Sequence, residues 1–275
     1  MLVISLSTIP SRFAQLGETL DCLLAQTAQV DAINLYIPAH YNRFPDWDGQ
    51  VPDVPDGITI RRTDQDFGPA TKVLAAAREF AGQNCEILFC DDDRAYPPDW
   101  AAGFLAARSA HQDCAIAALG FHANEGARNL QPRALRRWRI TDLEFQARFF
   151  MRKITSRLTG RAVTEPGRRV WKRSGYVDIF EGCGGVLVRP EFFDDTAFDI
   201  PDLARSVDDV WLSGMLAAHG VPIWLDGNRY EPENTAAESF DPLVTSVIDG
   251  ADRADSNRAA IQYLQKTYGI WPDSR

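Results

Sequence analysis

The chain has 275 residues, of which 45% are hydrophobic and 24% charged, a composition typical of a soluble globular protein with one large domain. Its net charge of -9 argues against a general nucleic-acid-binding protein. Because no run of about 18 apolar residues is present, we expect no membrane-spanning helix.

Short apolar segments alternate with helical patterns through the first 121 residues. The apolar start has no preceding basic residue and no small-residue cleavage site, which favours a first strand over a signal peptide. Strands are predicted at 2–7, 32–38, 58–63, 86–90 and 115–121, and helices at 13–26, 68–81 and 98–110. This alternation predicts an α/β fold with a mainly parallel sheet flanked by helices.

The second half of the chain is less regular. A basic amphipathic helix is predicted over 134–158, followed by a loop over 159–175. Strands broken by glycines are expected within 176–190, and the periodicity of 206–220 predicts a helix. A strand at 222–225 and a helix at 258–269 complete the pattern. The five cysteines contain no C-x-x-C pair, which indicates neither a zinc site nor a disulfide framework and fits a reducing cytoplasm.

Three consecutive aspartates, Asp91, Asp92 and Asp93, directly follow the apolar strand predicted at 86–90. In an open parallel sheet, ligands bind at the carboxyl ends of the strands. Side chains alternate in direction along an extended segment, so Asp91 and Asp93 are expected to point the same way, about 7 Å apart at Cα. Two such carboxylates can share one divalent cation, and their oxygens suit Mg²⁺ or Mn²⁺. The alternative is that the acids form a solvated turn.

The stretch ILFCDDDRAYPPDW resembles the D-x-D region of nucleotide-sugar glycosyltransferases of the GT-A fold, especially the family 2-like enzymes. The resemblance covers most of the chain in order. It includes the segments VISLSTIPSR, DFGPATKVLAAA, GCGGVLVRPEFF and SVDDVWLSGML. The order and spacing of these motifs carry the resemblance, because a D-x-D pattern alone is a weak signal.

The resemblance implies a GT-A (Rossmann-like) α/β fold with a mixed, mainly parallel sheet flanked by helices and a basic helical insertion. We therefore expect residues 1–275 to form a single glycosyltransferase domain. Its parts would be a nucleotide-binding half (1–121), the basic insertion (125–175), an acceptor and catalytic half (176–230) and a C-terminal tail with a helix (231–275). The implied activity is transfer of a sugar from a nucleotide diphosphate, with UDP expected, to an acceptor hydroxyl with inversion. Cell-surface glycan synthesis is one setting for it.

By the same resemblance, several residues would bind the donor. Thr8, Pro10 and Arg12, at the end of the first strand, would hold the base and ribose. Asp66 would contact the nucleoside and Lys72 would meet the diphosphate, where a helix N-terminus also favours anions. For the first turn, the alternative is an ordinary strand-to-helix turn with a Ser cap. For the second, it is that Asp66 only caps the turn and Lys72 is solvated.

Further donor contacts are implied at Glu181, Gly184 and Gly185, because glycines let the backbone approach a ligand closely. A bulge or a tight hairpin would explain the same glycines. Asp92 and Trp211 complete the expected substrate-binding residues.

The acidic pair in SVDDVWLSG resembles the pair that opens a helix in inverting members of the family. By this match Asp209 is the general base on the acceptor hydroxyl and Asp208 is its neighbour. Such a base contributes roughly 10²–10⁴ in rate. The alternative is a capping box between Ser206 and Asp209.

Two features depart from the family pattern. Many GT-A enzymes offer a late histidine as a further metal ligand, yet no histidine follows His219. The extra acid, Asp92, leaves open which two members of the cluster bind the Mn²⁺ or Mg²⁺, and we expect Asp91 and Asp93.

The segment from Arg128 to Arg173 holds 14 of the 29 basic residues but only 3 acidic ones. Within 133–157, basic residues alternate with aromatic and aliphatic ones, a pattern typical of a helix lying on a membrane surface. An acidic glycan or lipid-linked acceptor would also explain it. Further alternatives are a flexible lid, or a helix packed by its apolar side with its arginines solvated or paired to the acidic core.

We expect a cytoplasmic enzyme, or one held peripherally at the inner face of the membrane through 133–157, without nucleic-acid partners. One alternative function is a sugar-phosphate nucleotidyltransferase, but such enzymes usually carry a glycine-rich loop with Lys or Arg after the first strand, and STIPSRF is not one. Another is a non-catalytic module that binds sugar nucleotides or glycans.

Overall fold

The computed structural model describes residues 1–124, 131–137, 142–160, 163, 165–241 and 253–272. An eight-stranded sheet lies at its centre, with strand order β10-β13-β6-β12-β4-β1-β2-β3. Four neighbouring strands, β4, β1, β2 and β3, run parallel, whereas β12 is antiparallel to both its neighbours. The strands are β1 (Leu2–Ser7), β2 (Ala32–Pro38), β3 (Ile58–Thr63), β4 (Glu86–Phe89), β6 (Ala115–Ala117), β10 (Gly175–Val177), β12 (Val186–Val188) and β13 (Ile223–Leu225). The predicted mixed α/β sheet is confirmed.

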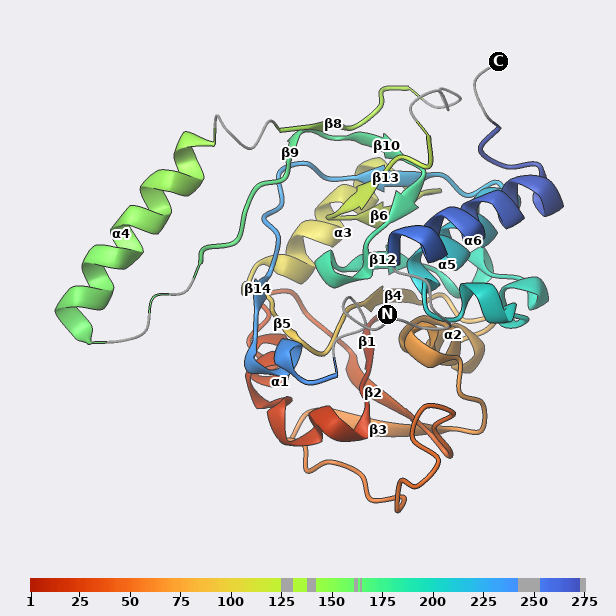
Figure 1. Ribbon diagram of the computed structural model, residues 1–275, viewed down its shortest axis with the longest axis horizontal. Helices are drawn as coiled ribbons and strands as arrows, with labels where there is room; N and C mark the ends of the chain where they lie inside the picture. The colour runs from red at the N-terminus through yellow and green to blue at the C-terminus, as the bar shows by residue number, and fades with distance from the viewer. Residues whose placement is uncertain (125–130, 138–141, 161–162, 164, 242–252, 273–275) are drawn as a thin grey trace.

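Helices cover both faces of this sheet (Figure 1). Side chains alternate along β1, so Val3 packs on one face with α2, α5 and α6, while Ile4 packs on the other with α1 and α3. The helices are α1 (Gly17–Leu24), α2 (Thr71–Glu79), α3 (Trp100–Ala110), α4 (Leu143–Thr159), α5 (Asp208–Ala218) and α6 (Arg253–Tyr268). Unlike the others, α4 lies apart from the sheet, at the margin of the molecule.

Three pairs of short strands connect distant parts of the chain. These are β5 (Arg94–Ala95) with β14 (Glu233–Asn234), β7 (Gly120–Phe121) with β11 (Ile179–Phe180), and β8 (Leu135–Arg136) with β9 (Trp171–Arg173). The first pair brings the segment after β13 directly beside the aspartate cluster, since β5 begins at the residue that follows Asp93.

The prediction for the basic segment is wrong at its start. The described part of the helix begins only at Leu143, where Asp142 accepts a hydrogen bond from the backbone N–H of Phe145 (3.1 Å). Residues 138–141 of the predicted helix lie outside the described residues. Leu135–Arg136 instead pairs with Trp171–Arg173, inside the predicted loop. A strand partner so distant in the sequence leaves no trace in local periodicity, so the helical pattern extends too far.

Other boundaries differ less. The predicted strand over 115–121 is divided into β6 and β7, because Leu119 turns away and its carbonyl accepts a hydrogen bond from the N–H of Glu181 (3.0 Å). The predicted helix over 13–26 is a 3-10 turn (Pro10–Gln15) followed by α1. The three strands predicted at 2–7, 32–38 and 58–63 have the predicted bounds.

Gly185 is expected to be intolerant of any side chain. Its φ is +91°, and an added Cβ would lie 2.4 Å from the indole of Trp100. Gly185→Ala should therefore lower the free energy of unfolding by about 2–4 kcal/mol, from backbone strain together with overpacking. Urea unfolding measures this loss. Gly220→Ala is the matched control, because Gly220 has a φ of +77° but no atom within 4 Å of the added Cβ; equal losses in both variants would refute the clash with Trp100.

Candidate active site

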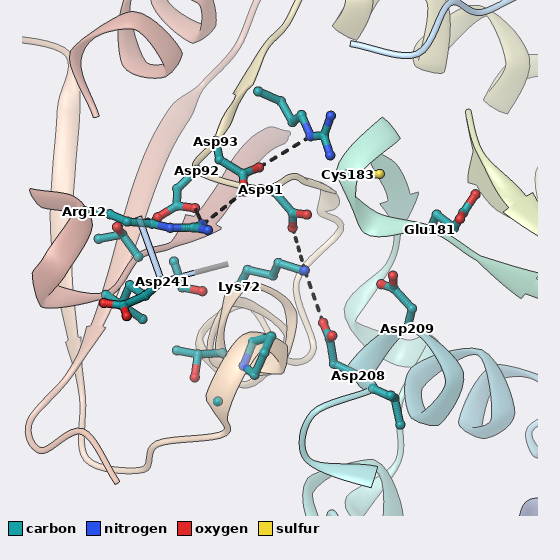
Figure 2. A pocket seen from close by; sticks show the side chains of 18 of the residues that line it. Arg12, Lys72, Asp91, Asp92, Asp93, Glu181, Cys183, Asp208, Asp209 and Asp241 are labelled. Atoms are coloured by element: carbon teal, nitrogen blue, oxygen red, sulfur yellow. Dashed lines mark hydrogen bonds and ion pairs between the residues drawn. The ribbon is translucent and has the colours of Figure 1, made fainter. Parts of the chain in front are cut away.

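A cavity of about 720 Å³ opens where β1, β2 and β4 end. Residues from both halves of the chain line it, as Figure 2 shows. Thr8 and Arg12 follow β1, the three aspartates follow β4, and Asp208 and Asp209 begin α5. The position at the carboxyl ends of parallel strands is the one expected for a ligand site in an α/β sheet.

Asp92 holds the turn that carries the cluster. Its carboxylate accepts hydrogen bonds from Thr8 Oγ1 (2.5 Å) and from the Arg12 guanidinium (2.6 Å). Thr19 Oγ1 donates to its backbone carbonyl (3.0 Å). Burial raises the pKa of Asp92 despite the opposing effect of Arg12. Both of its oxygens are thus engaged by protein groups, and its side chain is less exposed (6%) than that of Asp93 (14%) or Asp91 (28%).

The negative charge of the Asp93 carboxylate is only partly compensated by its neighbours. Arg12 lies 3.1 Å from its Oδ2 and Arg94 lies 3.5 Å from its Oδ1, yet the buried Oδ1 has no hydrogen-bond partner among the described residues. Burial, with repulsion from Asp91 and Asp92, raises the pKa of Asp93 to about 6. Because the two guanidinium groups do not bring its pKa down to the ordinary value, the ionised form of Asp93 would gain from a divalent cation, which proteins often hold by one or two carboxylates together with substrate phosphates. Among the described residues, no group of three or more His, Cys, Asp or Glu forms a metal cage.

Asp93→Asn is expected to stabilise the protein in the presence of a chelator. The carboxyl has a pKa of about 6 when folded and about 3.9 when unfolded. Because folding raises this pKa, the carboxyl makes its full contribution to the free energy of unfolding only below pH 4. That contribution is lost as the pH rises through 6, by up to about 3 kcal/mol. The variant should therefore unfold at a higher temperature than wild type at pH 7.5, with the gain shrinking towards pH 4. The exposed Asp202→Asn should show no such pH-dependent gain, and a lower melting temperature for Asp93→Asn at pH 7.5 would disprove the assignment.

Lys72 is a buried cation between two parts of the site. Its Nζ lies 2.6 Å from Asp91 Oδ1 and 3.1 Å from Asp208 Oδ2 (Figure 2), and only 6% of the residue is exposed. Burial alone would lower its pKa, but Asp208, Asp91 and Asp209 together raise the pKa well above its usual value. Lys72 also brings the pKa of Asp91 below its ordinary value, against the effect of burial. The ammonium therefore favours the ionised form of Asp91.

Asp209 lies in the first turn of α5, and its Oδ1 accepts a hydrogen bond from the N–H of Gly182 (3.1 Å). A Cβ on Gly182 would lie 3.0 Å from that oxygen, so a larger residue would crowd the contact. Burial and repulsion from Asp208 raise the pKa of Asp209 well above the usual value, although Lys72 opposes them. The capping-box alternative is wrong, because the N-cap is Val207 and no side chain caps the helix.

Two further predicted residues line the cavity, Asp66 and Glu181. Asp66 accepts hydrogen bonds from the N–H groups of Asn42 (2.7 Å) and Gly68 (2.8 Å), which is the capping role weighed above. Burial raises the pKa of Glu181, so this carboxyl carries a proton more readily than an exposed one.

Other predicted contacts lie in the packing behind the cavity. Trp211 is in the core, where its Nε1 donates to the carbonyl of Ala197 (2.9 Å). Gly184 accepts a hydrogen bond from Trp100 Nε1 (2.9 Å), and Gly185 lies against the same indole. Pro10 opens the 3-10 turn that presents Arg12. These positions support the site and do not line it.

Several lining residues were missed by the sequence analysis. They are Tyr41, Arg43, Arg94, Cys183, Glu231, Glu238, Asp241, Arg253 and Asn257, among others. Arg94 directly follows the aspartates and could have been chosen as a cation that meets the same ligand. By contrast, Asp241 and Arg253 come from the last part of the chain, where no local motif marks them.

No protein-family profile matches the chain, and no curated protein is similar to it. Among solved structures, it is similar to residues 1–349 of S. aureus TarS, at 10% identity and a TM-score of 0.45, over 97% of this chain and 72% of that one. The same fragment in complex with UDP matches at 10% identity and a TM-score of 0.43, over 83% and 59%. GalNAc-T7 with UDP, GalNAc and Mn²⁺ matches at 12% identity and a TM-score of 0.46, over 82% and 42%. At these values, the function must be argued from the residues of the chain itself.

Proposed function

We propose that the protein is a metal-dependent, inverting glycosyltransferase of the GT-A type that uses a nucleotide diphosphate sugar, with UDP as the nucleotide favoured by its motifs. One observation carries the proposal. Two carboxylates able to hold a cation, Asp91 and Asp93, share a single cavity with Asp209, a carboxylate at the start of a helix.

The donor would lie across the carboxyl ends of the strands. On one side, Thr8, Tyr41 and Asp66 line the part of the cavity where the nucleoside would lie. On the other, Asp91 and Asp93 would hold Mn²⁺ or Mg²⁺, with Arg94 and Arg253 also lining the cavity. When bound, the cation would supply positive charge to the leaving diphosphate.

Asp209 would take the proton of the acceptor hydroxyl. The hydroxyl oxygen forms a bond to the anomeric carbon while the bond from that carbon to the diphosphate oxygen breaks, so the configuration inverts and no sugar becomes attached to the protein. The raised pKa of Asp209 makes its carboxylate a stronger proton acceptor, and Lys72 opposes the rise by favouring the ionised form. The hydrogen bond from the N–H of Gly182 holds the carboxylate of Asp209 in place.

The proposal extends to the organisation of the chain. Residues 1–275 would form one catalytic domain that acts in the cytoplasm or at the inner face of a membrane, on a glycan or lipid-linked acceptor. The described residues contain no helix long and apolar enough to span a bilayer.

A panel of nucleotide sugars, tested for thermal stabilisation and for release of free nucleotide, tests this function. We expect UDP-sugars to raise the melting temperature in Mn²⁺ but not in chelator, and nucleotide release to require the same cation. Stabilisation without any turnover would indicate a binding module. Release of pyrophosphate from a nucleoside triphosphate and a sugar phosphate would indicate a nucleotidyltransferase. Indifference to every nucleotide would refute the proposal.

A further inference from the structure

One face of α4 is held by the rest of the chain. Phe145 is buried on this face, with the guanidinium of Arg168 over its ring at 3.7 Å. Arg148 donates to the carbonyl of Gly167 (2.9 Å), and Arg152 donates to Glu233 Oε2 (2.7 Å). The helix is therefore fixed in orientation, and its arginines on this side are satisfied by protein groups.

The opposite face of α4 is apolar and bare. At about 100° per residue, its apolar residues fall within an arc of about 100° on one side of the helix. They are Leu143, Ala147, Phe150, Met151, Ile154 and Leu158, here called the outer stripe. Leu143 is 74% exposed, Phe150 63%, Met151 60%, Ile154 37% and Leu158 82%. The alternative that this helix packs by its apolar side is wrong for the outer stripe, which faces outward. The pairing of Arg152 with the acidic Glu233 is as that alternative expects.

Charge on α4 is opposite to that of the rest of the chain. The helix carries Arg148, Arg152, Lys153 and Arg157 against the single acid Glu144, whereas the whole chain has a net charge of -9. Lys153 and Arg157 are exposed and border the outer stripe. Long basic side chains in this position can extend to lipid head groups while the apolar residues between them enter the acyl boundary.

We propose that the outer stripe of α4 docks on an anionic lipid surface. Pairing of two copies through the stripe would bring the cations of two helices together, whereas anionic lipid complements them. The acidic remainder of the chain would be repelled by an anionic lipid surface. The helix α4 lies apart from that remainder, at the margin of the molecule (Figure 1).

Docking of α4 on a bilayer would also hold the candidate active site near the membrane surface. Glu233, which binds Arg152 of α4, belongs to β14, and β14 pairs with β5 immediately after Asp93. The backbone N–H of Thr235 donates to the Asp93 carbonyl (2.9 Å). A helix lying on a bilayer would thus hold the cavity near the surface through a short, hydrogen-bonded path.

Sedimentation with vesicles of phosphatidylcholine, with and without phosphatidylglycerol, tests the proposal on the intact chain. The wild type should sediment with the anionic vesicles and remain in solution with the neutral ones. Phe150→Glu and Leu158→Glu should each weaken vesicle binding by at least about tenfold. Thr159→Glu is the matched control, since it adds the same charge to an exposed position of α4 about 80° beyond the edge of the stripe, and it should change binding by less than about threefold.

Vesicle binding is measured without nucleotide, so this result is independent of the proposed enzymatic function. Circular dichroism and melting temperature report whether each variant keeps its fold, which the exposure of both positions favours. Absence of wild-type binding to anionic vesicles, or equal binding by all three variants, would overturn the proposal. So would a wild-type dimer in light scattering that Phe150→Glu and Leu158→Glu dissociate, because the stripe would then be an interface between two copies.

Discussion

Asp209→Asn is expected to lower kcat by about 10²–10⁴ while changing the affinity for the donor by less than about threefold. The amide has nearly the shape of the carboxyl and can still accept the hydrogen bond from Gly182, but it cannot take a proton from the acceptor. Because burial and Asp208 already disfavour the ionised form of Asp209, a neutral side chain should not lower the free energy of unfolding.

Initial rates with a UDP-sugar, together with calorimetric titration of the donor, measure the two quantities separately. Asp202→Asn is a suitable control, because this carboxylate is 97% exposed and contacts only Arg205 among the described ion pairs; its kcat should equal that of wild type. A variant at 209 that keeps full turnover would remove the general base from the scheme.

Lys72→Met is expected to lower the free energy of unfolding by about 3–5 kcal/mol, because it leaves the buried carboxylate of Asp208 and the partly buried carboxylate of Asp91 without their cation. Loss of the ammonium removes the main influence that lowers the pKa of Asp91 against burial, so this pKa rises in the folded variant. A raised folded-state pKa means that stability is retained at low pH and lost as pH rises. The deficit relative to wild type should therefore be larger at pH 8 than at pH 5.

Urea unfolding at the two pH values measures this dependence. Combining Lys72→Met with Asp208→Asn should recover part of the loss, since one uncompensated acid is removed. Lys266→Met, at an exposed position of α6, should lose less than about 0.5 kcal/mol. A pH-independent loss for Lys72→Met would point to lost packing alone and not to the pairing with acids.

The fold was most predictable where local pattern and tertiary environment agree. β1, β2 and β4 are buried strands of the sheet, so their apolar runs alone indicate them. The region around α4 was less predictable for the opposite reason. Leu135–Arg136 becomes a strand only through pairing with a distant segment, and the outward apolar face of α4 has the same periodicity as a face packed in a core.

The candidate site, too, was predictable from the sequence only in part. Asp91, Asp93, Asp208 and Asp209 were predicted and do share one cavity. The sequence could not show that Lys72 lies between Asp91 and Asp208, since a strand and two helices must pack before its ammonium reaches both. Nor could it show that Trp211 belongs to the core, because an aromatic residue in a helix has no local mark that separates packing from binding.

The proposed glycosyl transfer depends on a metal ion that is held by Asp91 and Asp93 and binds the diphosphate of the donor. Calorimetric titration of UDP tests this premise most directly. In Mn²⁺, wild type should bind UDP at least about tenfold more tightly than in chelator, and the double variant Asp91→Asn/Asp93→Asn should bind it equally in both. If wild type binds UDP equally well with Mn²⁺ and with chelator, the two aspartates do not hold a cation for the donor and the scheme is wrong.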